Sequence, residues 1–302
     1  MSRATLRSAL AAETPLVTPL AHDALSARLI ERAGFRAFAI GGSAMLAARY
    51  ALPDIGLAAR GEMADGIRDI AAATTVPFLA DGDDGYGDVK SVALTVASYE
   101  RLGVGGILIE DQRRDRKQPR AEGAKGVVDM AEMTAKLRAA MAARRDPETL
   151  IIGRTDAYGA LGLDAAIERA RAFVALGVDA VFVAGLKREE EYARVGRELA
   201  GATLSAAVFE GVGTPWLTPA ALGAMGYRHV SFPATLLFRA VGTMRDTLAA
   251  LRRHADGTAT MQPAGDAGQS RATLDAALDL GRWQAIEAEF ATPGVPADGK
   301  GA

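Results

Sequence analysis

Short apolar runs alternate with amphipathic stretches along almost the whole chain. Each run is long enough for a buried strand, and apolar residues recur every three or four positions between the runs, as on one face of a helix. The predicted strands are residues 16–21, 35–40, 76–80, 106–109, 150–153, 180–184, 204–209 and 229–232. The predicted helices are residues 5–13, 23–34, 62–74, 88–102, 130–145, 163–176, 187–199, 218–225 and 236–253.

The strict alternation of strands and helices predicts a parallel sheet covered by helices. Eight such pairs are the number that closes into a (β/α)8 TIM barrel, so this α/β fold is the main prediction. An open, doubly wound sheet is the alternative. Polar residues favour the barrel because they gather at the C-terminal ends of predicted strands, where barrel active sites are built. These residues are Asp81, Asp83, Glu110, Arg154 and Glu210.

The most acidic strand end is residues 79–87, which read Leu-Ala-Asp-Gly-Asp-Asp-Gly-Tyr-Gly. Carboxylates crowded at one strand end repel one another, and a hard divalent cation with oxygen ligands would relieve that repulsion. The alternative is that these acids only cap the helix that follows. Acids and an arginine at other strand ends favour a metal-assisted active site on this rim.

The end of the chain lies outside the eight pairs. We assign residues 1–255 to the barrel domain and residues 256–302 to a linker, a C-terminal helix and a disordered tail. The linker is rich in Gly, Ala, Thr and Asp, and residues 271–290 have the apolar periodicity of one helix. We expect this helix to pack on another subunit or on the flank of the barrel.

The amino-acid composition of the chain excludes several classes of function. The 302 residues carry a formal net charge of −2, which predicts neither a nucleic-acid-binding surface nor a membrane surface. Cysteine is absent, which excludes disulfides, thiolate metal sites and a cysteine nucleophile. No apolar stretch has the length of a signal peptide or a membrane span. The prediction is a cytoplasmic protein whose partner is a small molecule.

Several motifs together resemble the isocitrate lyase/phosphoenolpyruvate mutase superfamily, nearest to its methylisocitrate lyase-like and carboxyphosphoenolpyruvate mutase-like branch. They occur in the order of that family and cover most of the chain from Thr18 to about Arg253. The matching segments are Asp-Ala-Leu-Ser-Ala-Arg-Leu (23–29), Leu-Pro-Asp-Ile-Gly (52–56), Asp-Gly-Asp-Asp-Gly-Tyr-Gly (81–87), Ile-Glu-Asp-Gln (109–112), Gly-Arg-Thr-Asp-Ala (153–157) and Gly-Thr-Pro-Trp-Leu-Thr (213–218) with Glu210 before it.

The resemblance implies a barrel whose last helix is exchanged with a neighbour, in a homotetramer built as a dimer of dimers. It also implies a Mg²⁺ site, which Mn²⁺ could fill. The acid matching Asp83 coordinates the metal directly in the family, and those matching Asp54, Asp81 and Glu110 hold the water shell of the metal. This division suits Mg²⁺, which keeps several of its waters.

The same resemblance assigns the substrate contacts. The arginine matching Arg154 binds a substrate carboxylate, and the backbone at Gly41, Gly42 and Ser43 donates hydrogen bonds to a 2-oxo acid. An ion pair with a neighbouring acid is the alternative role for Arg154. Asp54 and Gln118 complete the predicted substrate-binding set.

The loop after Glu110 departs from the family pattern. In the lyases this loop carries a cysteine that acts as general acid, and Gln118 stands at its position by ungapped counting. Ala184 and Ala207 replace further polar residues of the lyases. The basic loop, residues 113–125, is either a solvated loop or a lid. The length of the loop favours a lid whose Arg116, Lys117 and Arg120 cover an anionic substrate.

The resemblance, taken with these residues, implies a Mg²⁺-dependent carbon–carbon lyase. It would act on a 2-hydroxy or 2-oxo di- or tricarboxylate and release a 2-oxo acid such as pyruvate. The predicted catalytic residues are Arg154, Glu110, Glu210, Arg116 and Lys117. The alternatives are an oxaloacetate-type decarboxylase, a phosphonopyruvate or carboxyphosphoenolpyruvate mutase or hydrolase, and a non-catalytic ligand-binding descendant.

Overall fold

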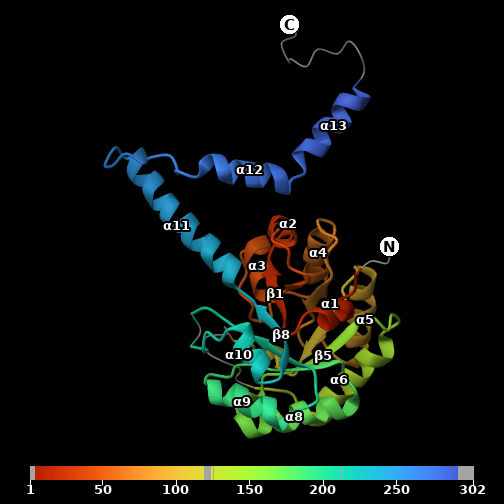
Figure 1. The fold of residues 1–302 in the computed structure, drawn as a ribbon. Helices are drawn as coiled ribbons and strands as arrows, with labels where there is room; N and C mark the ends of the chain where they lie inside the picture. Colours follow the sequence, from red (N-terminus) through yellow and green to blue (C-terminus); the bar gives the residue numbers. More distant parts are fainter. Residues whose placement is uncertain (1–3, 119–123, 125, 212, 292–302) are drawn as a thin grey trace. The chain divides into compact units, whose positions relative to one another are not determined.

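A computed structural model of the protein describes residues 4–118, 124, 126–211 and 213–291. Eight parallel strands form a closed barrel in the order β1 to β8, and β8 pairs with β1 through Leu16 and His229 (Figure 1). This confirms the predicted TIM barrel, and the open doubly wound alternative is wrong. The strands are β1 (Leu16–Ala21), β2 (Phe38–Ile40), β3 (Phe78–Asp81), β4 (Gly106–Glu110), β5 (Leu150–Thr155), β6 (Ala180–Val183), β7 (Leu204–Ala207) and β8 (Tyr227–Phe232).

Helices surround the strands and bury an apolar layer between themselves and the barrel (Figure 1). Within this layer the rings of Phe38 and Phe78 stack with centroids 5.1 Å apart. The helices of this part of the chain are α1 (Leu6–Ala12), α2 (Ala24–Arg32), α3 (Gly42–Tyr50), α4 (Arg60–Ala71), α5 (Val89–Arg101), α6 (Met130–Ala143), α7 (Ala157–Leu161), α8 (Leu163–Leu176), α9 (Glu189–Glu198), α10 (Pro219–Ala224) and α11 (Thr235–Ala255), with a short 3-10 turn at Arg114–Arg116.

A second apolar cluster fills the barrel interior, and α1 closes its amino end. Leu6 of α1 packs at the start of β4, where a β-carbon on Gly106 would lie 2.7 Å from its Cδ2 atom. Leu16, Leu79 and Ile152 continue the same cluster from the strands. The interior behind α1 is therefore packed with apolar side chains, while Asp81 and Glu110 lie at the carboxyl ends of β3 and β4.

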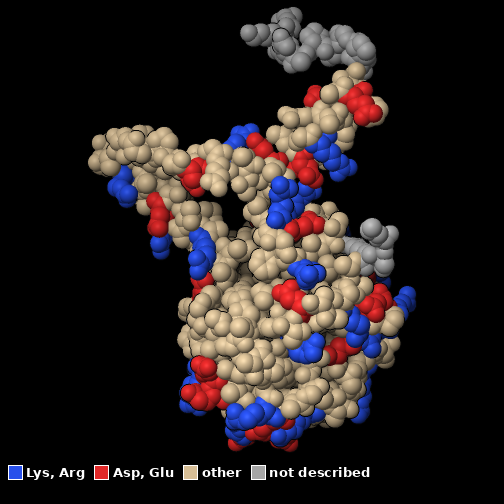
Figure 2. All heavy atoms as spheres, viewed as in Figure 1, with Lys and Arg blue, Asp and Glu red and all other residues tan. Residues whose placement is uncertain are grey.

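The surface of the barrel mixes both signs of charge. Figure 2 shows basic and acidic side chains side by side, most densely near α8 and α9. There Arg194 lies 2.6 Å from Asp164 and 2.6 Å from Glu198. This mixed face differs from the one-signed surface that nucleic acids select. No helix among the described residues is long and apolar enough to cross a membrane.

The chain divides into two compact units, Met1–Met244 and Arg245–Ala302, and α11 runs through the division. The second unit contains α12 (Ala267–Ala277) and α13 (Leu280–Phe290). The prediction of one helix over 271–290 is therefore wrong. The break falls at Asp279, whose φ of 55° is left-handed and cannot continue a helix. The predicted disordered tail, 292–302, lies outside the described residues.

Candidate active site

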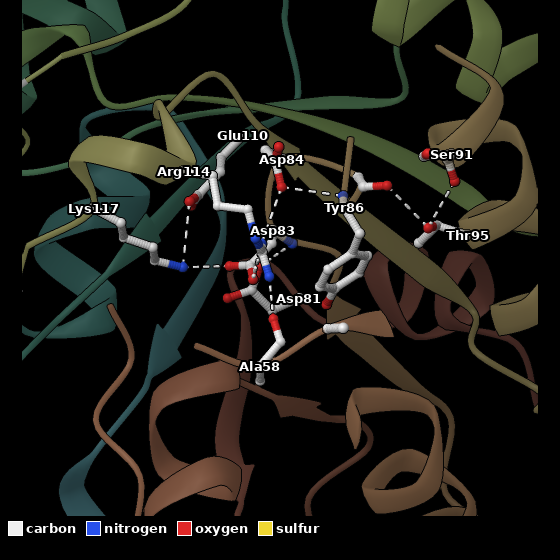
Figure 3. Close-up of polar contacts among 12 residues, drawn as sticks. Ala58, Asp81, Asp83, Asp84, Tyr86, Ser91, Thr95, Glu110, Arg114 and Lys117 are labelled. Carbon is white, nitrogen blue, oxygen red and sulfur yellow. Dashed lines mark hydrogen bonds and ion pairs between the residues drawn. The ribbon is translucent and has the colours of Figure 1, made fainter. Parts of the chain in front are cut away.

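Three carboxylates meet at the carboxyl rim of the barrel (Figure 3). Asp81 is the last residue of β3, Glu110 is the last residue of β4, and Asp83 lies in the turn after β3. One oxygen from each lies within 4.8 Å of the others. Three hard oxygen donors at this separation have the chemistry that a divalent cation such as Mg²⁺ requires.

Backbone contacts hold the turn after β3 against β4. The Gly82 amide donates to the Leu108 carbonyl at 2.8 Å, and the Glu110 amide donates to the Asp83 carbonyl at 2.8 Å. A β-carbon at Gly82 would lie 2.9 Å from the Leu108 oxygen, so the close approach requires glycine. Asp83 itself has a left-handed φ of 50°. This backbone brings the side chain of Asp83 beside those of Asp81 and Glu110.

A second layer of side chains supports the same turn. Tyr99 donates through its hydroxyl to the Asp81 carbonyl at 3.3 Å and lies 3.0 Å from the Tyr86 hydroxyl. Lys136, a buried residue of α6, donates to the Asp84 carbonyl at 3.1 Å. Neither Tyr99 nor Lys136 is among the residues predicted from the sequence. A tyrosine or a lysine in an amphipathic helix gives no sequence signal for an inward hydrogen bond.

The predicted substrate-binding glycines lie at the amino end of α3. Gly42 is the first residue of α3, and a β-carbon on it would lie 3.7 Å from Asp81 Oδ2 and 3.9 Å from Asp54 Oδ2. Gly41 is the N-cap residue and Ser43 is exposed. The first amides of a helix lack partners within the helix, so this end of α3 offers donors beside the acids.

Two cations of the basic loop point into the acidic site, which consists of Asp54, Asp81, Asp83 and Glu110 (Figure 3). Lys117 Nζ lies 2.9 Å from Asp54 Oδ1 and 3.5 Å from Glu110 Oε1, and it also donates to Asp83 Oδ1. Arg114 NH1 lies 3.3 Å from Asp83 Oδ2. Arg114 is not among the predicted site residues, because a run of basic residues does not show which of them points inward.

Arg154 is held by acids on two sides. Its Nε atom lies 2.7 Å from Asp156 Oδ2, its NH2 group donates to Asp156 Oδ1 at 2.8 Å, and its NH1 group lies 2.7 Å from Glu110 Oε2. Asp111, fully buried, accepts from the Asp156 amide at 2.8 Å and from Arg169 at 3.0 Å. These contacts fix the plane of the Arg154 guanidinium at the rim.

Burial and crowding shift the pKa values of the three acids in different directions. Burial raises the pKa of Glu110 to about 8, although Arg154 and Lys117 act against this shift. Burial and the neighbouring Asp83 also raise the pKa of Asp81. For Asp83 burial acts upward as well, but Lys117 and Arg114 outweigh it and lower its pKa. The site therefore contains acids that differ in how readily they ionise.

Three of the predicted residues are placed away from the acids. Glu210 lies three positions beyond β7 and pairs with Arg239 of α11 at 3.0 Å. Arg116 is exposed and Gln118 is half-buried. Within the part of the chain that the structure describes, none of these three contacts Asp81, Asp83 or Glu110. Arg120, which we also expected in the lid, lies outside the described residues.

Comparison with known proteins places the chain in a family. The family described as phosphoenolpyruvate phosphomutase matches residues 6–252. The chain therefore belongs to the isocitrate lyase/phosphoenolpyruvate mutase superfamily, as the motifs predicted, and it is an enzyme of that group. The superfamily is in general Mg²⁺-dependent.

Among its relatives, a probable 2-methylisocitrate lyase of Corynebacterium glutamicum is 39% identical over 83% of this chain and 82% of the relative. The 2,3-dimethylmalate lyase of Eubacterium barkeri is 36% identical over 82% of this chain and 86% of the relative. A structure of phosphonopyruvate hydrolase with oxalate and Mg²⁺ superimposes with a TM-score of 0.79 at 27% identity, over 95% of this chain and 98% of the other. The two relatives named as lyases support carbon–carbon cleavage as the chemistry of this group.

Proposed function

We propose that the protein is a Mg²⁺-dependent carbon–carbon lyase. It would cleave a 2-hydroxy or 2-oxo di- or tricarboxylate and release a 2-oxo acid such as pyruvate. The observation that carries this proposal is the juxtaposition of Asp81, Asp83 and Glu110 with the buried Arg154 on one barrel rim. The lyases among the relatives support the same chemistry.

The acids would hold the metal. Asp83 would bind Mg²⁺ directly, and Asp81, Glu110 and Asp54 would orient its waters; Mn²⁺ accepts the same oxygen donors. Bound there, the cation would supply Lewis-acid stabilisation of the negative charge that develops on the substrate 2-oxygen. Because Asp83 and Glu110 are buried and Asp81 beside them is half-buried, these acids would present a low-dielectric site in which this stabilisation is strong.

The substrate head group would lie between Arg154 and the amino end of α3. Asp156 and Glu110 take three of the guanidinium contacts of Arg154, and a guanidinium has five N–H donors. The remaining donors would bind the carboxylate of the 2-oxo acid. The amides at Gly41, Gly42 and Ser43 would donate to the same anion.

Lys117 and the neighbouring Arg116 would bring positive charge to the substrate, and Gln118 would face its distal part. Glu210, paired with Arg239, would act at the same distal end. Decarboxylation of oxaloacetate is a second candidate reaction. The chain has no cysteine to serve as general acid, and decarboxylation does not need an acid at the point of cleavage.

The test is an assay for 2-oxo acid release from malate, citramalate, methylisocitrate, dimethylmalate and oxaloacetate, with and without Mg²⁺. Asp83→Ala should abolish metal-dependent turnover. Asp88→Asn is the matched control, because Asp88 is an exposed carboxylate that caps α5 and Asn can also cap a helix. Conversion of phosphonopyruvate alone, or equal activity of Asp83→Ala and wild type, would overturn the proposal.

We also propose a homotetramer built as a dimer of dimers, with the C-terminal helix exchanged between subunits and the barrel domain ending near residue 255. Exposed apolar residues on α11 support this assembly, since Phe238, Val241 and Met244 are each about half exposed. Light scattering on the purified protein gives the mass directly. A cytoplasmic location is proposed on the absence of cysteine.

A further inference from the structure

The basic segment, residues 113–118, places a cation on each oxygen of the Asp83 carboxylate (Figure 3). Lys117 binds Oδ1 and Arg114 lies 3.3 Å from Oδ2. Lys117 also contacts Asp54 and Glu110, and only 7% of its side chain is exposed. Its ammonium group therefore lies among three of the four acids proposed to hold the metal.

A metal ion and the Lys117 ammonium cannot share this position. Mg²⁺ binds carboxylate oxygens at about 2.0–2.1 Å and carries its own water shell. The Lys117 nitrogen already lies 2.9 Å from Asp54 and contacts Asp83 directly. Two cations held by the same oxygens would overlap and repel each other. Direct coordination by Asp83 therefore requires at least one of its two cations to leave.

The contacts indicate that Lys117 is the cation that leaves. All three of its ion-pair partners belong to the acidic site. Arg114 has partners elsewhere: it lies 3.2 Å from Asp84, it donates to the Ala58 carbonyl, and its guanidinium lies 5.2 Å from the centroid of the Tyr86 ring. These contacts would keep Arg114 in place when the position beside Asp83 Oδ1 is taken.

We propose that Lys117 and a divalent cation are alternative occupants of the acidic site. Metal binding then expels Lys117 from the carboxylates and makes its ammonium available to a substrate carboxylate. The exchange is favourable in charge, because a divalent ion replaces a single positive charge among crowded acids. This inference rests on the proposed function, since it requires the metal to bind at Asp83.

Lysine acylation of the full-length protein tests the exchange without an activity measurement. The protein is acetylated briefly with and without Mg²⁺, and each lysine is quantified by mass spectrometry. We expect Lys117 to be protected without metal and to react several times faster with it. Lys90, with 86% of its side chain exposed, should react in both samples, and Lys136, 3% exposed, should remain protected in both.

Metal affinity gives a second, independent readout. Removing the competitor in Lys117→Gln should tighten Mg²⁺ binding, measured by calorimetry, by about tenfold. Arg113→Gln is the matched control because it removes the same charge from an exposed residue of the same segment that pairs only with Asp115 among the contacts described. Its Mg²⁺ affinity should change by less than about twofold, since an exposed charge is screened.

The outcomes separate this inference from the proposed function. If wild-type protein shows no Mg²⁺ binding, both are wrong. If Mg²⁺ binds but Lys117 stays protected, or if Lys117→Gln and Arg113→Gln change the affinity equally, the metal site stands and the exchange is wrong. Increased Lys117 labelling together with tighter binding in Lys117→Gln alone would support it.

Discussion

Two of the places where the barrel buries polar groups neutralise those groups in different ways. In the interior, His229 of β8 lies 2.8 Å from the Thr18 hydroxyl through Nε2 and 2.6 Å from the Ser205 hydroxyl through Nδ1. At the rim, Glu110 is buried to the same degree but faces Arg154 and Lys117. The first group is held by neutral hydroxyls and the second by charges.

This difference separates a structural site from a chemical one. The partners of His229 belong to strands β1 and β7, so they cannot leave without opening the barrel. Lys117, one of the two cationic partners of Glu110, comes from a loop and can be exchanged for another cation. Burial alone therefore does not mark a functional residue. A functional residue is better recognised by an excess of charge at its site together with ionic partners that can be replaced.

The largest effect is expected when Arg154 is removed. Arg154→Met deletes the guanidinium shared by Glu110 and Asp156 and should lower the free energy of unfolding by about 3 to 5 kcal/mol. It should also lower kcat/KM by more than about a hundredfold, because a buried, hydrogen-bonded charge contact to substrate is lost. Urea denaturation and steady-state kinetics measure the two effects.

Arg154→Lys is the companion variant. It keeps the charge but loses the planar fork that binds a carboxylate through two donors. We expect it to recover much of the stability and little of the activity. Wild-type stability in Arg154→Met would show that the guanidinium is not needed to balance these acids.

The next effect is a pH dependence that arises at the rim. The pKa of Glu110 is about 8 in the folded protein against an ordinary value of 4.5, so the folded state binds more protons between these values. Its contribution to stability is complete below pH 4.5 and is lost as the pH rises to 8. Without metal, we expect wild type to lose on the order of 4 kcal/mol relative to Glu110→Gln across this window.

Urea midpoints of both proteins at pH 5 and pH 8, in the presence of a chelator, measure this difference. Metal binding provides the cross-check, because coordination favours ionised carboxylates and should release protons near neutral pH. Calorimetry in buffers with different ionisation enthalpies measures the number of protons released on metal binding. Parallel pH profiles of wild type and Glu110→Gln would contradict the interpretation.

The interior histidine should show the opposite slope. Burial lowers the pKa of His229 to about 4 from 6.5, so the unfolded state binds more protons between these values. The contribution of His229 to stability is complete above pH 6.5 and falls by about 3 kcal/mol as the pH drops to 4. His229→Gln should lose this acid-side slope and leave Mg²⁺ affinity unchanged. An unchanged slope in the variant would show that His229 is not the group responsible.

The same contrast explains how much could be predicted from the sequence. The strand β1 and the helix α8 were predicted to the residue, because an apolar pattern and its flanking turn residues are local properties. The meeting of Asp81, Asp83 and Glu110 also followed, since parallel strands end on one rim. The break between α12 and α13 at Asp279 could not be predicted, because the residue with the left-handed φ is neither Gly nor Pro.

The partners of the acids could not be predicted in the same way. Lys117 and Arg114 lie in one basic run with Arg113 and Arg116, and only the fold decides which side chains turn inward. Lys136 reaches Asp84 from a helix that is distant in sequence. The sequence therefore predicts which charges must be balanced, while the tertiary contacts determine what balances them.

The smallest expected effect tests the neutral network itself. Thr18→Val removes the hydroxyl that lies 2.8 Å from His229 Nε2 and keeps the shape of the side chain. It should lower the free energy of unfolding by about 1 to 2 kcal/mol, since one buried hydrogen-bonding nitrogen loses its partner. Thr75→Val, at an exposed hydrogen bond to Glu31, is the control and should cost less. Because Thr18 lies in the interior network and contacts none of the rim acids that the structure describes, kcat and Mg²⁺ affinity should remain at wild-type values. A loss of metal affinity in Thr18→Val would show that the two buried sites are coupled through the barrel.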